Sequence, residues 1–282
     1  MDAAQHERDK LAALARELRQ PLYHHFSAGW DVVWAHLASR VDDVEALAQR
    51  FYDLGVAAQA RDTETIYHAQ LIALRRRQER LPDFISTVHA AVAAHPTLLV
   101  WRAVLPLTHL ASGDARAATA EFEWFATDRF GRVRRDMFWF ATICVLAETC
   151  TLLRDTARAE VLYDLLAPFK ERNVQVTQAA CWGSAERFLG LLAAVVGRGE
   201  TAVAHLQSAI AKNEAGGNSA AASLVRRDLA KLLAARGGAD ALDRAAALLQ
   251  DPLRAARVAG SESLAAHIKG EIEAVERQRL AL

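Results

Sequence analysis

Apolar residues recur with the period of an α-helix along almost the whole chain. In the stretch LVWRAVLPLTHLASG, four apolar positions fall on one helix face: Val100, Val104, Leu107 and Ala111. Pro106 lies within this stretch, where a proline is expected to kink the helix. No segment alternates convincingly between apolar and polar residues as a half-buried strand does, so the pattern predicts an all-α fold.

Short polar or glycine-containing breaks divide the helices roughly every 40 residues, a period typical of helix-pair solenoids. The breaks fall at Ser39-Arg40, Gln78 to Arg80, Gly113-Asp114, Arg154-Asp155, Gly197 to Gly199, and Gly237 to Asp240. We therefore expect one continuous domain over residues 1–282. It would consist of a leading helix over 5–19, helix pairs over 21–55, 61–94, 96–130, 134–168, 175–213 and 218–258, and a capping helix over 262–280.

Small residues are set regularly inside two expected helices between Cys181 and Glu214. Gly190 lies in the middle of a helix, where glycine costs roughly 1 kcal/mol relative to alanine, so we expect a neighbouring helix to cross closely over it. Leu189-Gly190 in the first helix, Gly197 at the turn, and three second-helix positions resemble a tetratricopeptide repeat: Ala202, Leu206 and Ala209. This resemblance implies a tetratricopeptide-like α-solenoid of about six helix pairs with capping helices.

Three segments carry a more specific resemblance: Asp136 to Trp139, Leu162 to Pro168, and Gly183 to Arg198. They are similar to the tetratricopeptide-like C-terminal region of large bacterial signal-transduction ATPases. That group includes LuxR- and MalT-type transcription regulators and class III adenylate cyclases fused to an ATPase. The resemblance covers about residues 20 to 260 and implies a regulatory, partner-binding module. The sequence contains no GxxxxGK[ST] motif, so we expect either a piece of such a regulator or a stand-alone relative.

Charge and composition limit the classes of partner that we expect the protein to bind. Lys and Arg total 34, as do Asp and Glu, and this balance argues against direct nucleic-acid binding and against attraction to a membrane surface. No run of about 18 apolar residues and no signal-peptide pattern appears in the sequence. The three cysteines have neither CxxC nor zinc spacing, so we expect reduced thiols, no cofactor, and a cytoplasmic protein.

Candidate binding residues come from two sources. The tetratricopeptide alignment places first-helix positions on a concave groove, with Trp182 at its rim: His36, Arg76, Arg77, Leu107, Glu148 and Arg187. Trp139 and Trp182 are expected at equivalent places in adjacent repeats, as packing residues or as part of an aromatic groove. The basic run Leu74 to Arg80 is interpreted as a solvated face near a helix end, or as a site for an acidic partner.

The stretch PLYHHFSAGWDVVWAH is interpreted as a packed amphipathic helix or as a ligand pocket, because His25 and His36 can share a helix face and Trp30 pairs with Trp34 at i, i+4. It offers no third ligand in the right place, so we expect no metal site.

Three functions remain open. The first is a non-enzymatic interaction or sensor module of a bacterial signalling or transcription-regulatory system, which binds a protein segment or a small effector on its concave face. The second is a stand-alone ligand-binding or catalytic solenoid with a pocket near His24 to His36. For a catalytic role the sequence offers only two side-chain pairs, Cys144 with Glu148 and Cys181 with Arg187. The third is a structural domain that assembles with copies of itself.

Overall fold

The computed structural model describes residues 2–281, and these residues are mostly helical. The first seven helices are α1 (Asp2–Leu18), α2 (Pro21–Leu37), α3 (Val41–Ala57), α4 (Thr63–Arg77), α5 (Ile85–Ala94), α6 (Leu99–Ala111) and α7 (Ala115–Ala126). The next seven are α8 (Trp139–Leu153), α9 (Thr156–Leu166), α10 (Glu186–Val195), α11 (Gly199–Ala215), α12 (Ser219–Arg236), α13 (Ala239–Val258) and α14 (Glu262–Leu280). The prediction of a predominantly α-helical chain is therefore confirmed.

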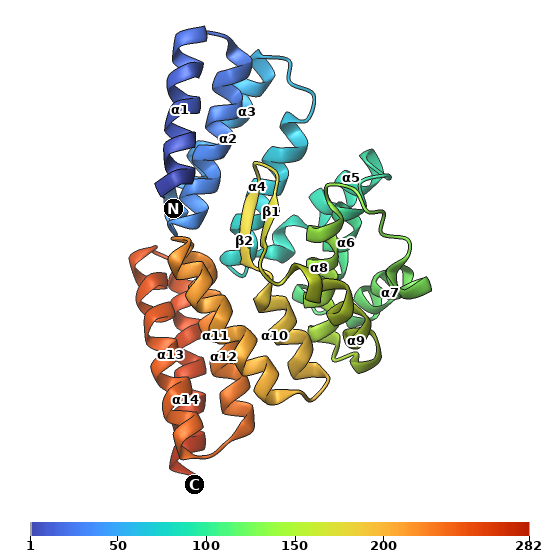
Figure 1. Cartoon of the computed structure of the whole chain (residues 1–282), viewed down its shortest axis with the longest axis vertical. Coiled ribbons are helices and arrows are strands. Elements are labelled where there is room, and N and C mark those ends of the chain that lie inside the picture. Colours follow the sequence, from blue (N-terminus) through green and yellow to red (C-terminus); the bar gives the residue numbers. More distant parts are fainter. Residues whose placement is uncertain (1, 282) are drawn as a thin grey trace.

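Neighbouring helices in the sequence mostly pack against one another. Figure 1 shows α1 to α3 at one end of the molecule, α11 to α14 at the other, and α4 to α10 beside them. Alternate helices also touch, since α8 packs on both α6 and α10, and α10 reaches α12. A contact between α2 and α12 joins the N-terminal helices to the C-terminal ones.

Each of the six expected breaks contains a residue with a left-handed backbone. These residues are Ser39 (φ 58°), Glu79 (58°), Gly113 (80°), Arg154 (55°), Gly197 (79°) and Gly237 (71°). Such a residue turns the chain out of the preceding helix while the last carbonyls of that helix still find N–H partners. By contrast, α6 continues through Pro106 and ends only at Ala111.

Gly190 lies in α10 where α11 crosses it. A Cβ atom built there would lie 2.7 Å from the Cγ of Leu206 and 3.2 Å from the carbonyl oxygen of Ala202. The first distance is shorter than real Cβ contacts and the second is tighter than most of them, so a residue larger than glycine would require Leu206 or the two helices to shift.

The expectation that no strand is present was wrong. Residues 173–184 form an antiparallel hairpin of β1 (Asn173–Val176) and β2 (Ala180–Ser184), so the helix expected from residue 175 begins only at Glu186. Gly183 has a φ of 86°, and the Oδ1 of Asn213 accepts a hydrogen bond from the N–H of Ser184 at 2.9 Å. These features hold the backbone extended, because a helix would need a negative φ at residue 183.

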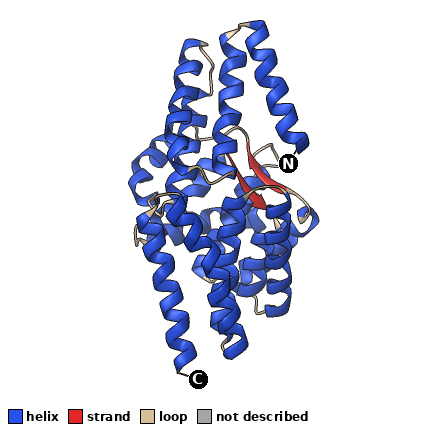
Figure 2. Ribbon diagram, turned by 90° about the vertical axis from the view of Figure 1, so that its left-hand side faces the viewer, coloured by secondary structure: helices blue, strands red, loops and turns tan. Residues whose placement is uncertain are grey.

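The hairpin is fastened to the N-terminal helices through Gln178 in its turn. The Nε2 of Gln178 donates to the carbonyl oxygen of Phe26 at 2.9 Å. The backbone carbonyl oxygen of Gln178 accepts a hydrogen bond from the Nε2 of Gln70 at 2.8 Å. Figure 2 shows the two strands near the middle of the molecule, surrounded by helices. The hairpin therefore links α2 and α4 to α10.

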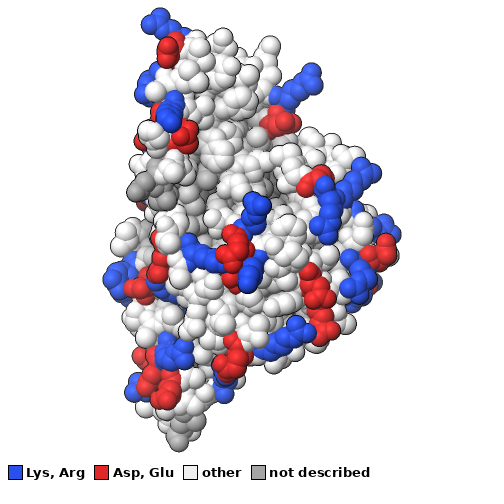
Figure 3. Space-filling view, viewed as in Figure 1, with Lys and Arg blue, Asp and Glu red and all other residues white. Residues whose placement is uncertain are grey.

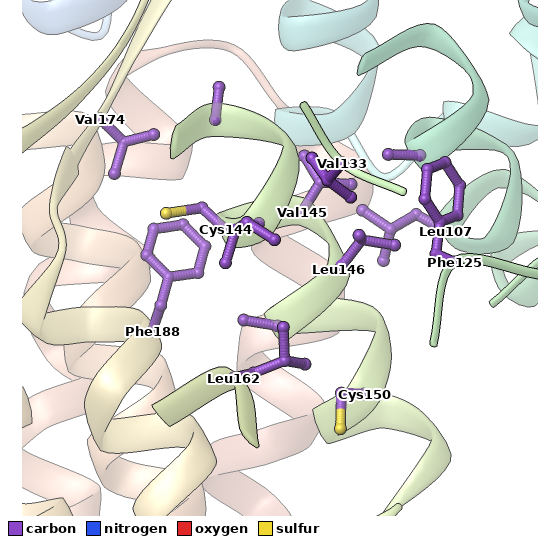
Figure 4. Packing of buried hydrophobic residues seen from close by; sticks show 14 of the residues in the cluster. Leu107, Phe125, Val133, Cys144, Val145, Leu146, Cys150, Leu162, Val174 and Phe188 are labelled. Atoms are coloured by element: carbon purple, nitrogen blue, oxygen red, sulfur yellow. The ribbon is translucent and has the colours of Figure 1, made fainter. Parts of the chain in front are cut away.

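The largest apolar cluster is built from residues of the elements α4 to α10, from Ile72 to Leu192. Figure 4 shows part of it, with Cys144 of α8 directed toward Phe188 of α10 and Val174 of β1. Two further clusters lie within residues 28–74 and 203–275. Among residues 2–281, no helix combines the length and the apolar character needed to cross a bilayer.

Candidate functional site

A hollow of about 770 Å³ lies where the helices meet, and we call it the central hollow. Its lining includes residues of α2, α4, α6, α8, α10, α12, α13, α14 and β2, and α12 contributes the most. The structure brings most of the groove residues expected from the sequence together there: His36, Arg76, Arg77, Leu107, Glu148, Trp182 and Arg187. Residues far apart in the chain thus share one wall.

His25 and Trp30 lie elsewhere. The Nδ1 of His25 donates to the carbonyl oxygen of Phe51 at 3.0 Å, and its ring stacks on the Phe51 ring with centroids 4.1 Å apart. Burial lowers the pKa of His25, although this backbone hydrogen bond opposes the effect. Trp30 is half-buried on α2 and does not line the hollow. His25 and His36 therefore do not form a single site, because the first contacts α3 and the second lies beside α4.

A buried ion network crosses the floor of the hollow. Glu148 of α8 pairs with Arg76 of α4 and with Arg187 of α10, whose Nη1 lies 3.2 Å from the Oε2 of Glu148. The Nε of Arg187 also donates to the Oδ2 of Asp228 in α12 at 2.7 Å. Burial alone would raise the pKa of Glu148, but the charges of Arg187 and Arg76 outweigh it and lower this pKa to about 2.

Sequence reasoning missed Asp228, although the repeat period carried a signal for it. Arg187 lies 39 residues after Glu148, and Asp228 lies 41 residues after Arg187. The helices α8, α10 and α12 thus each supply one member of the network at this spacing.

A second ion network also borders the hollow. Arg227 of α12 pairs with Glu79, at the end of α4, at 3.1 Å and with Glu271 of α14 at 3.0 Å. Lys231 also contacts Glu271 at 3.0 Å, and the Nδ1 of His267 lies 3.2 Å from Glu79. We call the contacts that Glu79 makes with Arg227 and His267 the clasp, because they join the N-terminal half of the chain to its C-terminal helices.

Arg77 has a different environment from these arginines. Its Nη1 donates to the carbonyl oxygen of His36 at 3.0 Å, and within residues 2–281 no carboxylate oxygen lies within 4.0 Å of it. Burial lowers the pKa of Arg77 to about 10. His36 is only 4% exposed, and its Nε2 has no hydrogen-bond partner among the described residues. Burial, reinforced by the charge of Arg77, lowers the pKa of His36 to about 3, so the ring is neutral at pH 7.

Five incompletely buried leucines give the hollow an apolar wall, which we call the leucine belt. Each comes from a different helix: Leu110, Leu152, Leu191, Leu224 and Leu264. Leu152 keeps 58% of its surface exposed. Trp182 lies beside this wall, with the guanidinium carbon of Arg76 5.5 Å from the centre of its ring.

Two sequence interpretations need correction. Trp139 is buried at the start of α8 and packs on Phe169, whereas Trp182 lies on β2, so the two tryptophans do not occupy equivalent places. Most of the basic run is not a solvated face, although Arg80 at its end is exposed. Arg75 pairs with Glu45, while Arg76 and Arg77 turn into the hollow.

The cysteine thiols are not activated. Burial raises the pKa of Cys144 well above its ordinary value, even though Arg187 lies nearby. Burial also raises the pKa of Cys150 to about 12 and raises the pKa of Cys181. A thiolate is the nucleophilic form of cysteine, so at neutral pH neither Cys144 nor Cys181 is poised for covalent chemistry.

No three His, Cys, Asp or Glu side chains within residues 2–281 are grouped to hold a metal ion. On the face seen in Figure 3, acidic and basic side chains are interspersed rather than gathered by sign. The central hollow is therefore the feature that best supports a function. No model of a known protein family matches this chain, and no curated protein matches it.

Proposed function

We propose that this protein is a non-enzymatic helical-repeat binding module whose central hollow holds a segment of a protein partner or a small effector. The observation that carries the proposal is the convergence of side chains from six alternate helices, α2 to α12, on one hollow of about 770 Å³. Stacked repeats use their inner surface for binding because each repeat contributes a few side chains to it.

The arrangement of helices supports a tetratricopeptide-like α-solenoid of about six helix pairs. Consecutive helices pack on one another, and α6, α8, α10 and α12 also form a contiguous row. The left-handed residues recur at the breaks, and the crossing at Gly190 admits no larger side chain. The even-numbered helices from α2 to α12 are then the first helices of the pairs, and these helices supply most of the hollow.

The resemblance in residues 136–139, 162–168 and 183–198 supports a regulatory role in a bacterial signalling or transcription-regulatory system. In such a role, an occupant of the hollow would be sensed through the helices that line it. The alternative of a catalytic pocket in the His24 to His36 segment has less support, because His25 is committed to the carbonyl of Phe51.

A photo-crosslinking amino acid at Leu152 tests the proposal. Leu152 faces the hollow and is 58% exposed, while Val56 on α3 has the same exposed fraction and lies outside the hollow. In cells that produce the protein, irradiation should give a covalent adduct at position 152 and none at position 56, as read by mass spectrometry. Equal labelling at both positions, or no adduct at position 152, would contradict a binding role for the hollow.

A further inference from the structure

The charged side chains around the central hollow include one more cation than carboxylates. Four cations, Arg76, Arg187, Arg227 and Lys231, face four carboxylates: Glu79, Glu148, Asp228 and Glu271. Arg77 is the fifth cation of this region, and among the described residues it meets only the carbonyl oxygen of His36. The hollow therefore keeps one positive charge that no side chain offsets.

A second observation points to the same place. His36 lines the hollow beside Arg77, is 4% exposed, and leaves its Nε2 without a partner. A buried polar atom without a partner is costly, and native structures usually satisfy such atoms with protein, water or ligand. Burial keeps the His36 ring neutral, so it adds no charge here. Arg77 thus supplies this part of the hollow with hydrogen-bond donors and a single positive charge.

The rest of the hollow is suited to an apolar group. The leucine belt offers incompletely buried side chains from five helices, and Trp182 adds an aromatic surface. The volume of about 770 Å³ lies within the range of small-molecule sites, roughly 300 to 1,000 Å³. A flat, singly charged carboxylate matches the fork of one guanidinium, whereas a doubly charged phosphate would leave negative charge unbalanced.

We infer that the central hollow binds a small amphipathic carboxylic acid, whose carboxylate is held by Arg77 beside the neutral His36 and whose apolar body lies on the leucine belt. This inference rests on the proposed function and specifies its effector. The carboxylate of the ligand lies at α2 and α4, and its apolar body extends toward α8, α12 and α14.

Isothermal titration calorimetry with decanoate, and with decanamide as its neutral counterpart, tests the inference. Decanoate should bind once per chain and at least tenfold more tightly than decanamide. The variant Arg77→Gln should weaken decanoate binding at least tenfold and leave decanamide binding unchanged, since only the charged hydrogen bonds are lost. Arg80→Gln removes the same charge from an exposed position three residues away and should change neither affinity.

Leu152→Glu provides a second variant, at the largely exposed end of the leucine belt. Leu152 is largely exposed, so the folded state tolerates a polar side chain there, while a negative charge on the leucine belt should weaken decanoate binding at least tenfold. Circular dichroism checks that each variant keeps its helices. Equal affinity for decanoate and decanamide, no saturable binding of decanoate, or an unchanged affinity in Leu152→Glu would overturn the inference.

Two further outcomes separate this inference from the proposed function. The tripeptide acetyl-Leu-Leu-Leu, with a free carboxylate and as its amide, represents the chain end of another protein. If only the tripeptide with the free carboxylate bound, and Arg77→Gln abolished that binding, the ligand of the hollow would be a peptide C-terminus and not a small acid. A protein adduct at position 152 without decanoate binding would leave the binding module intact and reject the small acid.

Discussion

Single residues at the ends of helices set where each helix stops. Arg154 ends α8 with a φ of 55°, a conformation that costs an L-residue roughly 1 to 2 kcal/mol relative to a right-handed one. Gly113 takes the same role after α6 with a φ of 80°, and no atom lies within 4 Å of a Cβ built there. Both positions therefore have a left-handed backbone, which suits the glycine and strains the arginine.

Arg154→Gly should raise the free energy of unfolding by about 0.5 to 1 kcal/mol, because glycine relieves the left-handed strain but adds freedom to the unfolded chain. Gly113→Ala should lower it by about 1 kcal/mol for the opposite reason. Urea denaturation of both variants measures the changes. A loss of stability in Arg154→Gly would show that the arginine side chain matters more than its backbone.

At the scale of helices, Glu148 joins three elements through one carboxylate. It lies on α8 and binds arginines of α4 and α10, and Arg187 extends the link to Asp228 on α12. The arginines lower the pKa of Glu148 to about 2, below its ordinary value of 4.5, against the opposing effect of burial. A carboxyl with a depressed pKa stabilises the fold above its ordinary pKa, and this stabilisation is lost as the pH falls toward 2.

Glu148→Gln should lower the free energy of unfolding at pH 7 by about 3 kcal/mol, because it leaves Arg187 buried with one partner fewer. The difference from the unmodified protein should shrink as the pH falls from 4.5 toward 2, as Glu148 itself becomes protonated. Chemical denaturation at a series of pH values measures both effects.

Glu160→Gln is the matched control, since Glu160 pairs with Arg198 at the surface and is 58% exposed. Its cost should stay near 0.5 kcal/mol. A pH-independent difference for Glu148→Gln would argue against an ionised carboxylate at that position.

The sequence predicts the helices well and the other elements poorly. The helical period of the apolar residues and the recurring breaks indicate where the helices lie. The tetratricopeptide alignment places Arg76, Glu148 and Arg187 on one surface. The hairpin was missed because strands as short as NVQV and ACWGS carry little pattern, and because residues from 175 onward were assigned to a helix pair. Three consecutive arginines look alike in a sequence, and only the packing of α2 against α4 distinguishes Arg77 from Arg75.

At the scale of the whole molecule, the two halves of the chain are fastened across the hollow. Glu79 contacts Arg227 and His267, and the Oγ of Ser219 donates to the carbonyl oxygen of Leu37 at 3.1 Å. Arg227 keeps Glu271 as a partner when Glu79 is removed. The clasp can therefore be weakened without leaving a buried charge unpaired.

Glu79→Gln should speed hydrogen exchange at the end of α4 and in α14 roughly threefold, the equivalent of about 0.7 kcal/mol in local opening. Exchange in α8 should stay unchanged, because its core contacts are untouched. Exchange measured by mass spectrometry gives both values. Glu273→Gln, on α14 but paired only within that helix, should change neither region. Unaltered exchange in Glu79→Gln would mean that the clasp does not hold the halves together.

The bond between Ser219 and Leu37 joins residues 182 apart in the sequence. Contacts between neighbouring helices form from nearby segments, whereas a contact at this separation must first overcome the entropy of a long loop. Because synthesis proceeds from the N-terminus, the early helices can pair while the later ones are still being made. A nascent chain can therefore complete the lining of the central hollow only after α12 and α14 have left the ribosome.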